Sequence, residues 1–314
     1  MLKNKIIIGT RGSNLALIQA NIVKNLLSAL NRNLDVKIEI IKTKGDRILD
    51  RALSKIGDKG LFTKELEIAL YNGEIDIAVH SLKDLPTELP EGIVLGGYLK
   101  REDVRDAFIS SDGRTLSEMK DGDVIATSSL RRSSQLLKIN KNFKIIDIRG
   151  NVETRLKKLE DGYCNATLLA CAGLIRAGLA DKITESLDPQ LIMPAVSQGI
   201  IGVEVLFSNV FVKEVLSEIT DKDALIMAEA ERVFLRKLEG GCQVPVACYS
   251  QIMGEQFRFS GMVCELNGEN QLKVELSGSL QKASEIASDT ADQIIQLGGD
   301  RILKEIKEQS VSGK

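Results

Sequence analysis

The stretch KIIIGTRGSNLALIQANIVKNLL, from Lys5 to Leu27, shows how the fold of this chain begins. Three consecutive isoleucines before Gly9 are typical of a short strand. From Leu15 onward, apolar residues return with the spacing of one helix face. A strand that runs directly into a helix favours an α/β protein, in which the two kinds of element alternate.

The same alternation continues through the first two thirds of the chain. Strands that alternate with helices are joined by crossovers, so mainly parallel sheets are expected. The predicted strands are Lys5–Gly9, Val36–Ile41, Ile75–Val79, Val124–Ala126, Lys144–Ile148 and Ala166–Leu169, and the predicted helices are Leu15–Leu30, Thr63–Tyr71, Leu130–Ile139 and Val152–Glu160.

The order of elements changes after about Asp221. A helix over Ala224–Leu238 is followed by a glycine turn, by strand-like Phe257–Cys264 and Gln271–Ser277, and by a helix over Ala283–Leu297. This order predicts a small, separate α+β domain at the end of the chain.

Two α/β domains are predicted before it. The charged connection KREDVRDAF, Lys100–Phe108, is where the second could begin. We expect residues 1–99 with 200–218 to form the first α/β domain, residues 100–199 the second and residues 219–314 the α+β domain, with a cleft between the two α/β domains.

The composition indicates an ordinary globular protein and argues against broad nucleic-acid binding. Hydrophobic residues make up 43% of the 314 residues, and the formal net charge is -2. Eight Phe, four Tyr and no Trp leave few rings for stacking on bases. No segment is apolar enough to serve as a secretion signal or to span a bilayer, so a cytoplasmic location without membrane contact is expected.

The cysteines and the single histidine show no metal or disulfide pattern. Five cysteines are odd in number, and they are scattered with no CxxC pair. One histidine cannot supply a multi-histidine metal site, so we expect no bound metal and interpret His80 as structural. The cysteines, expected to be reduced thiols, are Cys164, Cys171, Cys242, Cys248 and Cys264.

Three strand-to-helix junctions carry arginines beside Ser or Asn caps. An arginine in a first helical turn opposes the helix dipole at a cost of ~0.3–1 kcal/mol, so Arg131 and Arg132 need an anion. A bound carboxylate or phosphate would supply it, because helix N-termini offer free N–H groups and arginine offers a bidentate fork. The junctions are IIIGTRGSNLAL with Arg11 and Ser13, VIATSSLRRSSQ with Ser129, Arg131 and Arg132, and IIDIRGNVETRL with Arg149 and Arg155.

The glycine spacing in the first junction indicates which kind of anion could bind there. The segment GTRG, Gly9–Gly12, matches neither GxGxxG nor a Walker loop, which argues against a nucleotide and favours several carboxylates. At any single junction, a cap with an exposed arginine is the better explanation. The three junctions together favour a binding site.

Two further stretches carry candidate functional residues. In AVHSLKDLP, Lys83 favours the ionised form of Asp84, which suits that carboxylate to stabilising a cation or accepting a proton. The alternative is a turn aspartate that bonds its own backbone. The connection KTKGDRILDRALSKIGDKGL, Lys42–Leu61, is long and charged, and is either a solvated surface loop or a lid.

The turn LEGGCQVPVACYS, Leu238–Ser250, places Cys242 behind two glycines and ahead of a Val-Pro pair. A free cysteine is usually a small buried hydrophobe, which suits this glycine-rich turn poorly. The turn therefore favours a thiol that is exposed for chemistry.

Taken together, these stretches resemble the hydroxymethylbilane synthase family, whose members are also called porphobilinogen deaminases. The resemblance covers about Ile6–Ser250 in the family's order. It is carried by GTRGSNLALIQA, KGLFTKELEIALYNGEIDIAVHSLKDLPTELP, SSLRRSSQLL, RGNVETRLKKL, LLACAGLIRAG, PAVSQGIIGVE and LEGGCQVPVACYS.

The resemblance implies three domains, the first two similar to type II periplasmic binding proteins around a cleft. It implies the stepwise joining of four porphobilinogen molecules with loss of ammonia, followed by hydrolysis that frees linear hydroxymethylbilane. A dipyrromethane cofactor would be attached to Cys242 through a thioether. The two glycines would allow the unusual backbone angles of an exposed turn.

The resemblance also assigns roles to the charged residues. Asp84 would contact the cofactor and stabilise the positive charge that forms as ammonia leaves. The cofactor's carboxylates would be held by Lys83, Ser129, Arg131, Arg132 and Arg155, the substrate or the growing chain by Arg11, Ser13, Arg149 and Arg176, and the covering loop would contribute Lys55, Lys59 and Phe62.

The sequence departs from the family pattern at a few positions. Ser197 and Ile200 stand where the family more often has Gly and Ala, and Asn165 replaces a common Asp. None of these three residues has a role in the expected chemistry. Because of Ser197 and Ile200, the sequence does not determine where Gln198 lies or how readily the cleft moves.

Two other classes of function share part of this pattern. Two α/β domains around an anion-lined cleft also describe a non-catalytic carboxylate-binding or sensing protein, which would have no use for Cys242. A thiol-dependent acyltransferase would need a second base that the sequence does not show. We expect a monomeric enzyme whose partner is the small molecule porphobilinogen.

Overall fold

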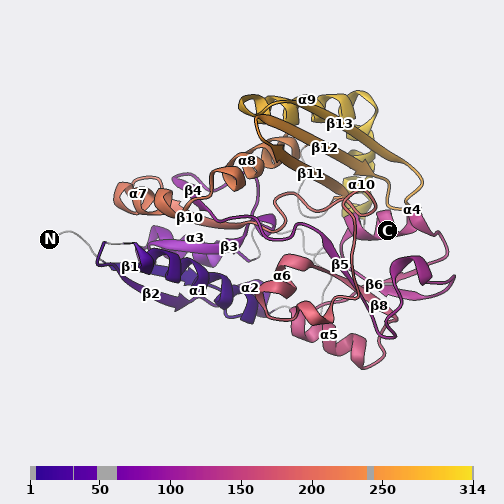
Figure 1. The fold of residues 1–314 in the computed structure, drawn as a ribbon, viewed down its shortest axis with the longest axis horizontal. Helices are drawn as coiled ribbons and strands as arrows, with labels where there is room; N and C mark the ends of the chain where they lie inside the picture. The colour runs from indigo at the N-terminus through magenta and orange to yellow at the C-terminus, as the bar shows by residue number, and fades with distance from the viewer. Residues whose placement is uncertain (1–4, 31, 48–61, 239–243, 313–314) are drawn as a thin grey trace. The chain divides into compact units, whose positions relative to one another are not determined.

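The computed structural model describes residues 5–30, 32–47, 62–238 and 244–312 (Figure 1). These residues form two compact units. The first contains the described residues up to 102 together with 199–225, and the second contains 103–198 and the described residues from 226 onward.

The first unit is built on a five-stranded sheet with one reversed strand. Strand β1 is parallel to β2 and β3, and β10 is antiparallel to both β3 and β4. The order across the sheet is β2 (Asp35–Ile40), β1 (Lys5–Thr10), β3 (Ile77–Ser81), β10 (Ile201–Leu206) and β4 (Ile93–Tyr98).

Helices lie on both faces of this sheet, which explains the unbroken isoleucine run of β1. Ile6 and Ile8 pack in a cluster with Val23 of α1, whereas Ile7 packs against the cluster that contains Leu66 of α3. A strand covered on both faces needs apolar side chains at successive positions. The helices are α1 (Asn14–Ala29), α2 (Lys44–Arg47), α3 (Lys64–Tyr71) and α7 (Val210–Ile219), and the short 3-10 helix η2 (Leu82–Asp84) follows β3.

The second unit repeats this sheet pattern. Strand β6 is parallel to β7 and β8, and β5 is antiparallel to β8 and β9. The order is β7 (Lys144–Ile146), β6 (Val124–Ala126), β8 (Ala166–Ala170), β5 (Asp106–Ser110) and β9 (Glu185–Ser186). Its helices are α4 (Leu130–Ile139), α5 (Val152–Glu160) and α6 (Cys171–Arg176), and its 3-10 helices are η3 (Leu116–Glu118) and η4 (Ala180–Lys182).

The second unit also holds a three-stranded antiparallel sheet. Phe234 packs edge-on against Phe259, with ring centroids 5.2 Å apart, in the core between this sheet and its helices. Gly261 makes that approach possible, because a Cβ there would lie 2.5 Å from the Phe234 ring. The elements are α8 (Lys222–Lys237), β11 (Val246–Met253), β12 (Gln256–Cys264), β13 (Gln271–Ser279), η5 (Leu280–Lys282), α9 (Ala283–Gln296) and α10 (Gly299–Ser312).

The predicted fold class is confirmed: two α/β sheets with the same pattern of strand pairing are followed by a small α+β part. The expectation of mainly parallel sheets was wrong, because two of the four described pairings in each of these sheets are antiparallel. The predicted start of one strand was wrong, since β3 begins at Ile77 and not at Ile75. Asp76 explains the shift, because its carboxylate accepts a hydrogen bond from the Ile7 amide at 2.8 Å. The three-domain division stays a prediction, as does the cleft. Among the described helices, none is long and apolar enough to cross a bilayer.

Candidate functional site

The predicted site residues of the first unit follow two neighbouring parallel strands. Arg11 and Ser13 come after β1, and Lys83 and Asp84 lie in η2 after β3. The carboxyl ends of parallel neighbours meet at one edge of a sheet, where α/β proteins bind ligands. The Gln19 side chain of α1 donates a hydrogen bond to Ser81 Oγ at 2.8 Å, which links α1 to the end of β3.

Arg11 and Phe62 are brought together in this unit. The guanidinium carbon of Arg11 lies 4.1 Å from the Phe62 ring centroid, a cation–π contact that orients the side chain. Ser13 caps α1, and its Oγ accepts a long hydrogen bond of 3.4 Å from the Ala16 amide. The other two predicted loop residues, Lys55 and Lys59, lie outside the described residues.

Asp84 is exposed at the end of η2, and Lys83 beside it is half-buried. Within the described part of the chain, the Asp84 carboxylate accepts no hydrogen bond, including from its own backbone. The alternative of a self-bonded turn aspartate therefore finds no support. The carboxylate is available to a ligand or to a reacting group.

In the second unit, the predicted arginines follow three neighbouring parallel strands. The α4 pair, Arg131 and Arg132, comes after β6, whereas Arg149 comes after β7 and Arg176 ends α6 after β8. Ser128 joins the first two loops, because its Oγ donates to the Ile148 carbonyl at 2.8 Å and accepts from the Ile148 amide at 3.1 Å. The sheet edge therefore gathers these residues within one unit.

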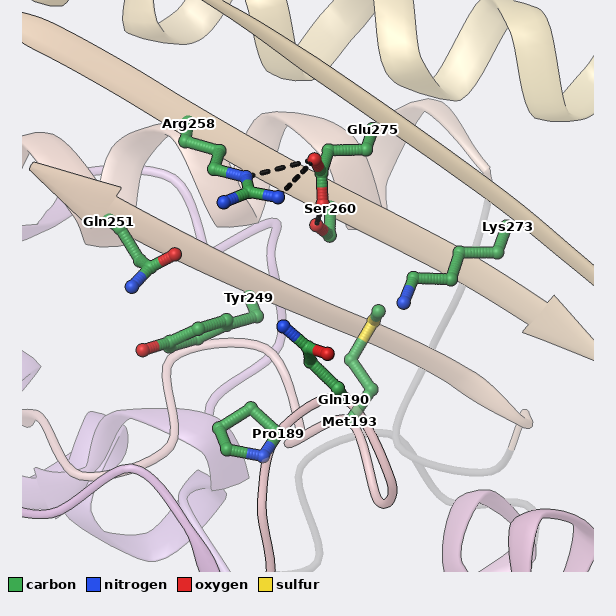
Figure 2. Close-up of a pocket in the computed structure, with 9 residues that line it drawn as sticks. All are labelled: Pro189, Gln190, Met193, Tyr249, Gln251, Arg258, Ser260, Lys273 and Glu275. Carbon is green, nitrogen blue, oxygen red and sulfur yellow. Dashed lines mark hydrogen bonds and ion pairs between the residues drawn. The ribbon is translucent and has the colours of Figure 1, made fainter.

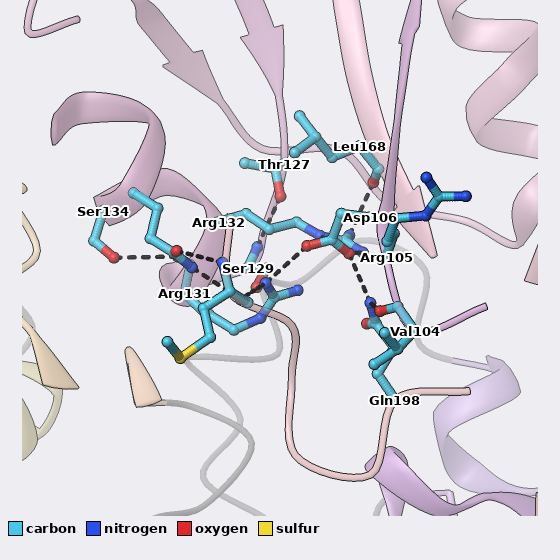
Figure 3. A network of polar contacts seen from close by, with 12 residues as sticks. Val104, Arg105, Asp106, Thr127, Ser129, Arg131, Arg132, Ser134, Leu168 and Gln198 are labelled. Atoms are coloured by element: carbon cyan, nitrogen blue, oxygen red, sulfur yellow. Dashed lines mark hydrogen bonds and ion pairs between the residues drawn. The ribbon is translucent and has the colours of Figure 1, made fainter. Parts of the chain in front are cut away.

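Arg131 and Arg132 share one buried carboxylate, that of Asp106 (Figure 3). Arg131 Nη1 donates to Asp106 Oδ2 at 2.7 Å, and Arg132 Nη2 donates to Asp106 Oδ1 at 2.7 Å. Backbone carbonyls complete the set, since Arg131 Nη1 also donates to Met193 O at 2.6 Å and Arg132 Nη1 to Leu168 O at 2.8 Å.

The protein itself therefore supplies an anion for Arg131 and Arg132, whereas the sequence predicted only a bound ligand. Asp106 is fully buried, and the two arginines are 5% and 6% exposed. Burial by itself raises the pKa of Asp106, but Arg131 and Arg132 together hold that pKa well below its ordinary value. Burial lowers the pKa of Arg131, and Asp106 opposes that change.

Gln198, whose placement the sequence left open, belongs to the same network. Its Nε2 donates to Asp106 Oδ1 at 3.0 Å and to the Val104 carbonyl at 2.8 Å. The preceding Ser197 has a positive φ of 60°, and its amide donates to buried Glu231 at 2.6 Å. Ser197, a position where the family resemblance more often expects glycine, thus adopts a conformation that favours glycine.

The other predicted ligand-binding groups of the second unit lie near the surface. Arg149 is half-buried, and burial lowers its pKa. Its Nε is buried and has no hydrogen-bond partner within the described chain, a state that costs about 1–3 kcal/mol unless a ligand accepts the bond. Arg155 Nε donates to the Gly150 carbonyl at 2.9 Å. Ser129 begins α4 without a side-chain cap, so its hydroxyl is not used in the helix.

The four described cysteines are all buried. Burial raises the pKa of Cys164 and Cys171, and it raises the pKa of Cys264 to about 12. Since the thiolate is the nucleophile, these thiols are unreactive near neutral pH. The predicted attachment residue, Cys242, lies outside the described residues.

Sequence reasoning missed Asp106 and the partner of His80. The polar start of the apolar segment DAFIS, Asp106–Ser110, was the available signal for a buried charge. His80 Nε2 lies 2.8 Å from Glu204 Oε2 in the core of the first unit, although their orientation does not form a hydrogen bond. Within the described chain, no group of three or more His, Cys, Asp or Glu is arranged to hold a metal ion.

A separate small pocket lies on the three-stranded sheet (Figure 2). Its volume of about 170 Å³ is below the range of most ligand sites. Arg258 on its wall is already paired with Glu275, and its Nε donates at 2.9 Å. None of the predicted site residues lines it.

Comparison with known proteins gives a consistent result. Residues 6–214 match the family model described as porphobilinogen deaminase, dipyromethane cofactor binding domain, and residues 225–296 match porphobilinogen deaminase, C-terminal domain. The porphobilinogen deaminase of Carboxydothermus hydrogenoformans is 45% identical over 98% of both chains. That of Syntrophomonas wolfei is 45% identical over 96% of this chain and 98% of its own.

Similarity to solved structures is more distant. The methionine binding protein MetQ aligns with a TM-score of 0.45 and 15% identity, over 73% of this chain and 95% of its own.

Proposed function

Because the chain belongs to the porphobilinogen deaminase family, we propose how its residues divide the work of that activity. The enzyme condenses four porphobilinogen molecules, with loss of ammonia, into linear hydroxymethylbilane. It is a transferase of tetrapyrrole and heme biosynthesis, and a covalently attached dipyrromethane is its cofactor.

The hydrogen-bond donors found in each unit suit the carboxylates of this cofactor. Each of its pyrrole rings carries an acetate and a propionate, so a binding site needs several donors for carboxylates. When bound, dipyrromethane supplies the primer to which the first substrate molecule is joined. We assign its carboxylates to Lys83 and Ser129 and to the arginines Arg131, Arg132 and Arg155. The uncapped Ser129 hydroxyl and the carboxylate-binding forks of the arginines support this assignment.

Cys242 is the residue to which we assign the thioether. The support is partly by elimination, because the other four cysteines of the chain are buried in the described structure. A group of two pyrrole rings attached to Cys248 or Cys264 would have to replace packed core, since both are 0% exposed.

Asp84 is the proposed catalytic carboxylate. Positive charge develops as ammonia leaves, and a fixed carboxylate stabilises that charge and can accept a proton. Its exposure and its lack of a described partner support the role. An aspartate already bonded to its own turn would be less available.

The remaining basic residues are assigned to the substrate and to the growing chain. The buried, unpartnered Nε of Arg149 supports a ligand carboxylate at that position. We place Arg11, Ser13 and Arg176 in the same group, with Phe62 holding Arg11 through its ring. Lys55 and Lys59 are proposed to belong to a loop that covers the site.

We also propose a monomer in the cytoplasm, with three domains and a cleft between the first two. All proposed functional residues come from one chain, so the mechanism needs no second copy. Light scattering of the purified protein would test the monomer.

These assignments rest on one contrast. Every described thiol is buried, whereas the loops at the ends of the strands carry side chains that can donate hydrogen bonds to carboxylates. Intact mass spectrometry should find the protein heavier than its sequence by one dipyrromethane, with the excess on the Cys242 peptide. Cys242→Ser should fold without the added mass, because serine is a much weaker nucleophile. The matched control Cys264→Ala should keep it. Added mass on Cys242→Ser would overturn the attachment site.

A further inference from the structure

Asp84, the proposed catalytic carboxylate, lies in a turn with little internal support. The 3-10 helix η2 spans only Leu82–Asp84, and 3-10 turns have poorer hydrogen-bond geometry than α-helices. Its closing hydrogen bond, from the Leu85 amide to the Leu82 carbonyl, is 3.1 Å long. Among the described residues, the Ser81 side chain caps none of its amides. The position of Asp84 therefore depends on contacts that the turn makes with the rest of the unit.

Leu82 attaches this turn to strand β10. The Leu82 amide donates to the Ile200 carbonyl at 2.9 Å, which continues the antiparallel β3–β10 pairing one step past Ser81. The Leu82 side chain is 1% exposed, whereas Asp84, two positions later, is exposed. A buried anchor and the proposed catalytic group thus share one short turn, so a shift of the anchor moves the carboxylate.

Gly202 of β10 is the residue on which the Leu82 side chain packs. A Cβ at Gly202 would lie 2.8 Å from Leu82 Cδ1 and 3.4 Å from Leu82 Cβ, and the first of these is well inside an ordinary carbon–carbon contact. Glycine weakens the interior of a strand, and it often marks a place where another group approaches closely. At this place the approaching group is the anchor of the turn.

Strand β10 is a firm base for that contact. It pairs with β3 on one side and with β4 on the other. Ile201, Val203 and Val205 are each at most 1% exposed. Because protein interiors are close-packed, a buried strand with two neighbours shifts little. The location of η2 is therefore determined by a strand that lies far from it in the sequence.

We propose that Gly202 and Leu82 are positioning residues for the reaction, because their contact sets where the Asp84 carboxylate lies. Neither residue binds the substrate in this role. A larger residue at Gly202 displaces the turn, and a smaller one at Leu82 loosens it. Stabilisation of a developing charge requires exact placement, and a shift of ~1 Å can cost about a hundredfold in rate. This inference rests on the proposed function, because it requires Asp84 to be the catalytic carboxylate.

The first test is Gly202→Ala in enzyme that carries its cofactor, with the release of ammonia from porphobilinogen as the assay. We expect kcat to fall about tenfold or more and KM to stay within about twofold, because the residues assigned to the substrate lie outside η2. The matched control is Gly96→Ala, whose Cβ would lie 2.6 Å from Val205 Cγ1 in the same sheet. It should lower the thermal midpoint similarly and keep the parent kcat.

Leu82→Ala tests the same contact from the other side, and it removes packing instead of adding a clash, so it serves even where Gly202→Ala does not fold. Here kcat should again fall about tenfold with KM unchanged. The control Leu27→Ala, at a fully buried position of α1, should lower the thermal midpoint and keep kcat. Leu82→Met keeps the side-chain volume and should retain most of the parent kcat. A merely structural role would lower the midpoints of the alanine variants and leave kcat unchanged in each.

The two proposals fail in different ways. Normal ammonia release by Asp84→Asn would overturn the proposed catalytic role. Slow release by Asp84→Asn, with Gly202→Ala and Leu82→Ala enzymes that keep the parent kcat, would overturn only the positioning role. The positioning role would also be overturned by an equal fall in kcat in the two control variants, since any loss of packing would then be sufficient.

Discussion

Arg131 and Asp106 form an ion pair that is closed to solvent, with Nη1 2.7 Å from Oδ2, although 25 positions separate them in the chain. Arg132 binds the other oxygen of the same carboxylate. A residue that the sequence placed only in a charged connection therefore holds two of the predicted cofactor ligands. Removal of the Asp106 carboxylate should lower the stability of the fold and weaken cofactor binding.

The pH dependence of folding should report this ion pair. The pKa of Asp106 is lower in the folded protein than its ordinary value of about 3.9, so its contribution to stability is complete above that pH and is lost as the pH falls below it. Asp106→Asn should cost about 3–5 kcal/mol at pH 7, because it leaves buried positive charge unpaired. Urea unfolding between pH 7 and pH 3 should show the difference from the parent narrowing with acid.

The control for this change is Asp112→Asn, which alters an exposed aspartate that is also paired with an arginine, Arg114. Its effect on unfolding should be small at every pH. An Asp106→Asn protein as stable as the parent at pH 7 would show that the pair is not a net source of stability.

Asp84→Asn should keep the fold and much of the substrate affinity but lose most turnover. The amide preserves size and removes the charge that faces the developing cation. The loss in kcat should be about hundredfold or more, equivalent to ~2.7 kcal/mol on the barrier. The release of ammonia from porphobilinogen by loaded enzyme measures it.

Glu88→Gln, a change of the same type at an exposed carboxylate of the same segment, should leave kcat near the parent value. Near-normal ammonia release by Asp84→Asn would assign the catalytic carboxylate elsewhere.

Single arginine replacements should stop elongation at different lengths. Arg131→Leu or Arg132→Leu should give mainly apo-protein, because both arginines are assigned to the carboxylates of the cofactor. Arg149→Leu and Arg155→Leu should permit more assembly but accumulate partial chains, since later carboxylates lose a bidentate partner. Mass spectrometry after mixing with porphobilinogen would display these species as a ladder.

Arg301→Leu, on an exposed position of α10, is the control and should match the parent ladder. If the four variants also matched the parent, the four arginines would have no role in chain assembly. A common loss of all binding would indicate a single-ligand site.

Ser197→Gly should stabilise the protein by about 1 kcal/mol. Glycine relieves the positive φ of 60° and removes a buried hydroxyl that has no partner within the described chain. The added freedom of the unfolded chain offsets part of that gain. Urea unfolding measures the change, and Ser197→Val should be clearly destabilised, because a β-branched residue tolerates this conformation poorly. A Ser197→Gly protein less stable than the parent would contradict the strain argument.

Several features of this protein were determined by local sequence. Apolar periodicity and caps predicted α4 and α5 at their observed bounds, because those signals lie within each helix. The arginines were correctly placed at the ends of parallel strands, because strand and helix alternate with short connections. The motifs of the Gly-Gly-Cys turn and the Lys-Asp turn identified the family without any coordinates.

Other features were decided only by tertiary structure. Strand β10 lies between β3 and β4, with Val203 opposite Val79, and no local pattern reports a pairing across so many residues. From the sequence alone, Asp106 is compatible with a solvent-exposed charge. In the folded protein, its carboxylate accepts hydrogen bonds from Arg131 of α4 and from Gln198. Local sequence sets which residues can form a strand, a helix or an anion-binding loop, whereas burial and charge pairing depend on which distant segments the folded chain brings together.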